Sequence, residues 1–274
     1  MLVFPLDEHT EKLMSSMNLP GLIHQSTDRP PRPRISAANT EFATVIVGHE
    51  RKEFTVHKDL LTHYSDFFRA ALTGQFREAR DNTVTLPQDQ PLDFEVFVDW
   101  LYYQRFPHKG LGDDADLVAQ ITLDDGQPDA DIFVYQYVFA DKYKVEQLKN
   151  DSINGLTFAV QDHAKCPVPS PDGISYAFDS LDQESPMCRL IVELVVRWLD
   201  PFINNEFESY DNVSFLQSLW KKYALHALDR TVPKYASVVN VCDFHEHKND
   251  EEWAMCESDQ MRIKCLCNEL GEAC

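Results

Sequence analysis

The stretch FTVHKDLLTHYSDFFRAAL, residues Phe54–Leu72, decides the fold. A short β-branched run leads into leucines and aromatic residues that recur every three or four positions, the spacing that places side chains on one helical face. Ser65 interrupts the helical pattern, and a serine hydroxyl accepts hydrogen bonds from the amides that open a helix. The stretch therefore predicts the end of a strand followed by two short helices, the second of them capped by Ser65.

Two further strands are predicted on either side of this stretch. The β-branched run FATVIVG begins at Phe42 and ends at Gly48, and the polar residues HERK separate it from EFTVH. Two such runs around a short polar turn are typical of a β-hairpin. A third short strand is expected in TVTL, residues 83–86, which Pro87 ends.

The rest of the chain reads mainly as helix. Apolar residues recur at helical spacing in PLDFEVFVDWLYYQRF, FVYQYVFADKYKVEQLK, MCRLIVELVVRWLD and NVSFLQSLWKKYALHALD. Strands come first and helices dominate afterwards, an order typical of an α+β protein in which helices cover a small sheet.

The pattern divides the chain into four parts. Residues 1–40 contain the Pro/Arg-rich linker DRPPRPRIS, residues 41–150 hold the strands and first helices, residues 151–240 form a C-terminal helical region, and residues 241–274 are an acidic tail with cysteines and histidines. An acidic insertion, residues 107–131, carries seven aspartates against a single lysine. We expect that insertion to be a solvated loop, partly disordered, that buries little apolar surface.

Composition narrows the classes of partner and compartment. The 274 residues are 43% hydrophobic, which suffices for a core, and carry a net charge of -20, which disfavours nucleic acid as a direct partner. No run is long and apolar enough to cross a bilayer, so no membrane association is expected. The seven cysteines, odd in number and concentrated toward the C-terminus, suggest reduced thiols or metal ligands and hence a cytoplasmic or nuclear location.

The quoted motifs carry a family resemblance. ATVIVG, FTVHKDLLTHYSDFFRAALTGQFRE, NTVTLP, FEVFVDWLYY and YVFADKYKVEQLK resemble, in this order, a BTB/POZ domain. The resemblance implies a small β-sheet covered by helical hairpins. GISYAFDSLDQESPMCRLIVELVVRWL is similar to the all-helical extension of fungal proteins that carry a single BTB domain.

The chain shows no frame for catalysis. It lacks G-x-S-x-G, G-x-G-x-x-G, H-E-x-x-H and a phosphate-binding glycine loop. His57 and His63 are six residues apart, so on one helix they would point in different directions and could not bind a metal as an i, i+4 pair does. We expect His57 in the core with a backbone partner and His63 exposed. Asp59 and Asp66 are better explained as solvated helix charges. We therefore predict a non-enzyme, although the sequence leaves open a cysteine and a histidine that meet in space.

Phe76 and Glu78 are the predicted partner-binding residues. In BTB adaptors of cullin ubiquitin ligases, a hydrophobic residue stands two positions before an acidic one at this place, and the resemblance gives these roles to Phe76 and Glu78. The alternative is that Phe76 packs in the core against Phe68 and Leu72. The sequence thus predicts a protein-interaction module, either a cullin adaptor or a homotypic-assembly or transcription-cofactor protein that forms homodimers.

The tail contains a candidate zinc site. Cys242-x-x-His245 is a spacing that brings a thiolate and an imidazole to one metal ion. The predicted ligands are Cys242, His245, Cys256 and Cys265, with Cys267 as the alternative to Cys265 and His247 as a competing ligand. The alternative is a flexible acidic tail with free thiols and no cofactor.

Overall fold

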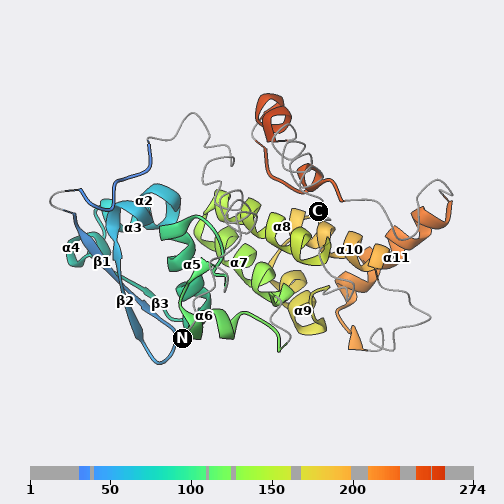
Figure 1. The fold of residues 1–274 in the computed structure, drawn as a ribbon, viewed down its shortest axis with the longest axis horizontal. Coiled ribbons are helices and arrows are strands. Elements are labelled where there is room, and N and C mark those ends of the chain that lie inside the picture. The colour runs from blue at the N-terminus through green and yellow to red at the C-terminus, as the bar shows by residue number, and fades with distance from the viewer. Residues whose placement is uncertain are drawn as a thin grey trace, which may run out of the picture.

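The computed structural model describes residues 31–37, 40–108, 111–124, 128–161, 168–198, 209–228, 239–247 and 249–256. Figure 1 shows a small sheet at one end of the molecule, the helices α9 to α11 at the other, and α7 and α8 between them. This arrangement confirms the α+β class and the helical extension.

Three strands form the sheet, in the order β2-β1-β3. Strand β1 (Phe42–Val47) pairs antiparallel with β2 (Lys52–His57) and parallel with β3 (Thr83–Leu86). The predicted hairpin is confirmed. Its turn begins at Gly48, whose φ of 75° is unfavourable for residues with a side chain.

Two helices follow the sheet hairpin directly. Helix α2 (Lys58–Tyr64) ends at Ser65, whose extended backbone separates it from α3 (Asp66–Thr73). The Ser65 hydroxyl accepts from the amide of Phe68 at 3.1 Å and donates to the carbonyl of Tyr143 at 2.6 Å. The predicted cap is confirmed, and the same hydroxyl also ties this corner to a distant helix.

The remaining elements are helical. They are α4 (Arg77–Asp81), α5 (Pro91–Tyr103), α6 (Ala115–Gln120), α7 (Ala130–Tyr143), α8 (Glu146–Gln161), α9 (Pro171–Ser180), α10 (Pro186–Trp198), α11 (Val213–Leu228) and the 3-10 turn η3 (Val241–Asp243). Among the described residues, none of these helices has the length and apolar character that crossing a bilayer requires.

Two apolar cores run through the molecule, and α7 contributes to both. One core lies between the sheet and α2, α3 and α5, and takes Phe139 and Tyr143 from the end of α7. The other lies among α7 to α11 and takes Phe133 and Tyr137 from the same helix. Helix α8 runs through residue 150, where the sequence divides the chain, so the helical region continues the sheet-bearing part without a linker.

The expectation of a solvated loop at residues 107–131 is wrong for much of its described part. Helix α6 lies within it, Leu117 and Ile121 are buried in the helical core, and Val118 is also buried. Several of the aspartates have structural partners: Asp114 caps α6 and Asp129 caps α7. A count of charges overestimates solvation here because a carboxylate that accepts helix amides is already satisfied.

Candidate functional site

The first candidate is the end of the sheet domain where α3 gives way to α4. Helix α3 ends at Thr73, Gly74 follows, and Phe76 is the residue that precedes the first turn of α4. A Cβ on Gly74 would lie 3.2 Å from the Phe76 ring and 2.6 Å from the carbonyl oxygen of Ala70, so only glycine permits this close turn. The backbone therefore fixes where the Phe76 side chain leaves the surface.

Phe76 is exposed to 65%, whereas Phe68 and Leu72 on the preceding helix are buried. The reading in which Phe76 packs with those two residues in the core is therefore wrong. Glu78, in the first turn of α4, is exposed as well. We call residues 76–81 the α4 surface.

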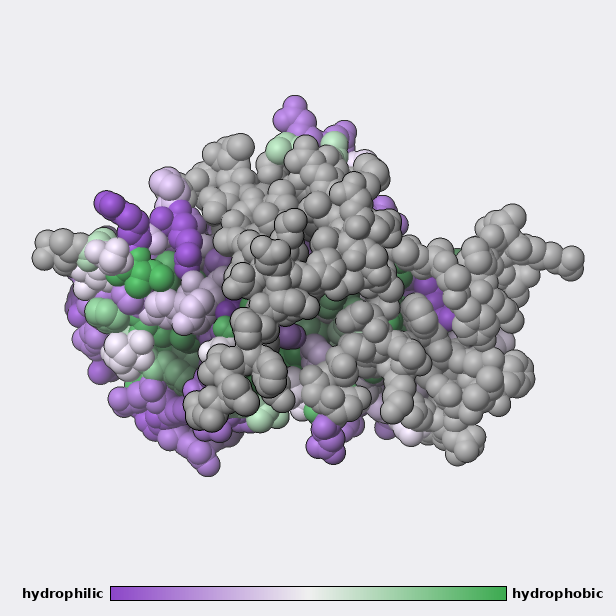
Figure 2. All heavy atoms as spheres, viewed as in Figure 1, coloured by the Kyte–Doolittle hydropathy of each residue, from purple (hydrophilic) through white to green (hydrophobic). Residues whose placement is uncertain are grey.

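The α4 surface is electrically balanced although the chain is strongly acidic. Helix α4 reads REARD, and Arg77 pairs with Asp81 at 3.0 Å one turn later. Figure 2 shows the sheet end of the molecule, where hydrophobic residues are visible among hydrophilic ones. Helix α4 therefore adds no net charge next to Phe76.

The histidines of the opening stretch do not form a site with each other. The Nδ1 atom of His57 lies 2.5 Å from the Tyr102 hydroxyl, and the His57 amide donates to the same hydroxyl at 3.2 Å. The prediction that the His57 ring bonds to the backbone is therefore wrong, because its partner is the Tyr102 hydroxyl. The ring of His63 packs edge-on to that of Tyr64, and His63 is half-buried rather than exposed.

The second candidate lies in the tail. Four potential metal ligands come together within the described part of the chain: Cys242, His245, His247 and Cys256. Their ligand atoms all lie within 4.8 Å of one another. The Sγ atoms of Cys242 and Cys256 are 3.6 Å apart, and Nδ1 of His245 is 3.2 Å from Sγ of Cys256.

Local structure explains how so short a segment converges. Asn240 caps η3 by accepting the Cys242 amide, and the turn that follows brings His245 back toward Cys242. Cys256 arrives from a separate helical segment, residues 250–256. Three of the four predicted ligands are therefore brought together; Cys265 lies outside the described residues, and His247 takes the fourth place.

The imidazoles and the cysteines are held in a polar environment. The Nε2 atom of His245 lies 3.0 Å from Oδ1 of Asn154 on α8, while Nε2 of His247 is buried without a hydrogen-bond partner. The hydrogen bond between Cys242 and Cys256, helped by His245 and His247 and opposed by burial, lowers the pKa of Cys242 to about 4.

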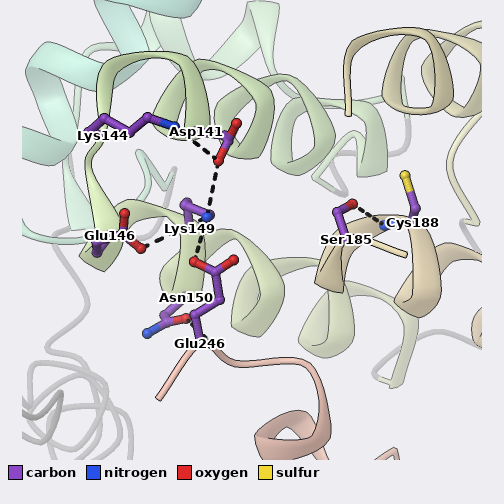
Figure 3. Close-up of polar contacts among 8 residues, drawn as sticks. All are labelled: Asp141, Lys144, Glu146, Lys149, Asn150, Ser185, Cys188 and Glu246. Atoms are coloured by element: carbon purple, nitrogen blue, oxygen red, sulfur yellow. Dashed lines mark hydrogen bonds and ion pairs between the residues drawn. The ribbon is translucent and has the colours of Figure 1, made fainter. Parts of the chain in front are cut away.

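The segment that carries these ligands is bound to α8. Lys149 is buried, and its Nζ lies 2.5 Å from a Glu246 carboxylate oxygen and 3.2 Å from one of Asp141 (Figure 3). Burial opposes protonation of Lys149, but the carboxylates around it, Glu246 foremost, hold its pKa above the usual value. The Glu246 amide also donates to the Asn150 side chain at 3.2 Å.

Sequence reasoning missed these contacts with α8. Lys149, Asn150 and Asn154 read in the sequence as ordinary polar residues of one helix, about a hundred positions away from the tail. Asn150 and Asn154 are four residues apart and therefore lie on the same face of the helix. This spacing was the one sequence signal of a shared polar contact.

Comparison with known proteins gives the sheet-bearing part a family. Residues 36–126 match the model of the BTB/POZ domain. Kelch repeat and BTB domain-containing protein 4 from Homo sapiens and from Mus musculus are each 32% identical to this chain over 62 residues. The match covers 23% of this chain and only 12% of each relative, so the chain spans a small part of the length of these relatives.

Proposed function

We propose that this chain, which contains a BTB/POZ domain, is a non-catalytic adaptor that recruits substrates to a cullin ubiquitin ligase. The BTB/POZ domain is generally a non-enzymatic protein-interaction domain. In the proposed mechanism, one surface binds the cullin scaffold and the helical region presents a client protein. We place this activity in the cytoplasm or the nucleus.

One observation supports the proposal above the others: Phe76 is exposed to 65% two residues before an exposed glutamate. Leaving a phenylalanine ring in water forgoes roughly 1.5–3 kcal/mol of burial free energy. Large aromatic residues at the centre of an interface are among those that contribute most to binding. Phe76 has the character of such an anchor.

Glu78 gives the surface a polar companion. By the resemblance to cullin adaptors, Phe76 fills an apolar pocket on the partner and Glu78 lies at its margin. A carboxylate at the margin accepts hydrogen bonds or pairs with a cation while it stays partly hydrated, which favours orientation more than affinity. Phe76 would thus provide most of the binding affinity, and Glu78 would fix the orientation of the partner.

The test is binding of the full chain to purified cullin scaffold from the native host, measured by calorimetry. We expect Phe76→Ala to weaken binding roughly 30-fold or more, the effect of losing an interface anchor of about 2 kcal/mol. Phe158→Ala is the matched control, since Phe158 is also an exposed phenylalanine but belongs to α8. The control should bind as the wild type does.

Two results would overturn the adaptor proposal. One is equal binding by wild type and Phe76→Ala. The other is no binding by the wild type. If the wild type then self-associates with increasing concentration in light scattering, the alternative function, a homotypic-assembly or transcription-cofactor protein that forms a homodimer, takes its place.

A further inference from the structure

The tail segment 239–247 contacts both α8 and α10. The Glu246 side chain pairs with Lys149 and its amide donates to Asn150, both on α8 (Figure 3). On α10, the Arg189 guanidinium lies 5.8 Å from the centre of the Phe244 ring. The ligand cluster therefore stands on a positioned backbone.

We propose that Cys242, His245, His247 and Cys256 bind one Zn²⁺ ion, which joins the helical segment 250–256 to the tail segment on α8. The site lies outside the BTB/POZ match, which ends at residue 126. It does not depend on the proposed cullin contact.

The distances suit a tetrahedral ion. Zinc lies about 2.3 Å from sulfur and about 2.0–2.1 Å from nitrogen, so tetrahedral angles place two sulfurs about 3.8 Å apart and a sulfur and a nitrogen about 3.6 Å apart. The corresponding distances here are 3.6 Å between Cys242 and Cys256 and 3.2 Å between His245 and Cys256. These two distances are within a few tenths of an ångström of the tetrahedral values, and the four ligand atoms, which all lie within 4.8 Å of one another, would move closer together on binding the ion.

The donor set selects the metal. Two thiolates and two imidazoles are the ligands of structural zinc, whereas Ca²⁺ and Mg²⁺ require oxygen donors. Cys242 is the most deeply buried ligand, 3% exposed. Four protein ligands leave no open position, so the ion would be structural and not catalytic.

The two histidines support the assignment independently of the distances. Nε2 of His245 lies 3.0 Å from Asn154 Oδ1, and Nδ1 of the same ring lies 3.2 Å from Sγ of Cys256. Such a bond to the second ring nitrogen is usual for metal-binding histidines. Nε2 of His247 is buried without a hydrogen-bond partner, and the His247 ring has a ligand atom within 4.8 Å of those of the other three residues.

The first experiment measures metal in the full-length protein, purified with a thiol reductant and without added metal, by inductively coupled plasma mass spectrometry. We expect one zinc per chain in the wild type and loss of zinc in Cys256→Ser and His247→Ala. Cys265→Ser is the matched control and should keep its zinc. After exchange into Co²⁺, the wild type should show the visible absorption of a tetrahedral thiolate site.

Several results would overturn the assignment. Zinc that is absent from the wild type, with a Cys242–Cys256 disulfide in its non-reduced peptide map, would make the pair of thiols a redox pair. Zinc that survives His247→Ala but is lost in Cys265→Ser would give the fourth position to Cys265. Bound copper or iron in place of zinc would refute the identity of the ion.

The second experiment examines Asn154, which acts as a positioning residue. Asn154→Ala should weaken zinc affinity by about 10- to 100-fold in competition with a chelator, while saturating zinc restores one ion per chain. Asn154→Asp keeps an acceptor for Nε2 of His245 and should restore most of the affinity. Unchanged affinity in Asn154→Ala would refute the positioning role and with it the proposed ligating nitrogen.

Discussion

The α4 surface and the cluster of Cys242, His245, His247 and Cys256 in the tail show opposite exceptions to the usual burial of apolar groups and exposure of polar ones. At the first, an apolar ring, Phe76, is left in water. At the second, a polar atom, Nε2 of His247, is buried without a partner. An exposed aromatic ring is consistent with an absent apolar partner, whereas two thiols and two imidazoles that converge in one place are consistent with an absent cation. The comparison leads to two different proposals, a protein partner and a metal ion.

Asp151 provides the strongest challenge to this comparison, because it too carries a buried atom, Oδ1, without a partner. Its other oxygen accepts from the Trp100 indole at 2.8 Å. Burial raises the pKa of Asp151 from 3.8 to about 7, against the opposing effect of that hydrogen bond. Burial thus favours the uncharged form of the carboxyl group, so an unpaired buried atom indicates a missing ligand only where other donors surround it.

Asp151→Asn is the prediction with the largest effect. Since the folded protein holds the proton up to about pH 7 and the unfolded chain loses it near pH 3.8, this group makes the wild type less stable as pH rises between those values. Relative to the wild type, the variant should gain up to about 4 kcal/mol of unfolding free energy between pH 4 and pH 8, at about 1.4 kcal/mol per pKa unit. Urea unfolding of both proteins at pH 4 and pH 8 measures this gain. Parallel pH profiles of the unfolding free energy would contradict the prediction.

Lys149→Met tests how strongly the tail is attached to α8. Its removal leaves Glu246 and Asp141 without their buried cation, and we expect the unfolding free energy to fall by about 1–3 kcal/mol because both carboxylates retain some contact with water. Protease cleavage after residue 239 should become faster as the tail is released from α8.

Lys144→Met is the matched control for Lys149→Met. Lys144 pairs with the same Asp141, at 3.7 Å, but its side chain is exposed. Its loss should change the unfolding free energy by no more than about 0.5 kcal/mol. Equal effects of the two substitutions would show that burial of Lys149 contributes nothing to tail attachment.

Phe76→Ala should have the smallest effect on stability. The ring is mostly in water, so its removal should change the unfolding free energy by no more than about 0.5 kcal/mol, measured by urea unfolding with circular dichroism. A loss above about 1.5 kcal/mol would show that the ring stabilises the fold, and the contrast between the two regions would then fail.

Local rules made much of the fold predictable. The hairpin before His57, the cap at Ser65 and the third strand all follow from residue types whose backbone and hydrogen-bond preferences act within a few positions. The acidic insertion was mispredicted for the opposite reason. Its aspartates were counted as solvated charge, but Asp114 and Asp129 accept amides at helix starts that depend on tertiary packing of Leu117 and Ile121.

The candidate metal site was also predictable only in part from the sequence. The sequence identified Cys242, His245 and Cys256 because short spacings between ligands are visible along the chain. It offered several choices for the fourth ligand, because the direction of the chain after residue 247 depends on what the tail contacts. Contacts of the tail with Lys149, Asn150 and Asn154 join positions roughly a hundred residues apart, and no local pattern records them.

By itself, the sequence determined the order of strands and helices, the break at Ser65, and the residue types at both sites. These depend on periodicity and on hydrogen bonds between near neighbours, which any short window of the chain contains. Only the tertiary structure decided that Phe76 faces water while Phe68 does not, and that His247 lies within reach of two thiols. Exposure and convergence depend on which distant surfaces pack together, and that is a property of the whole chain.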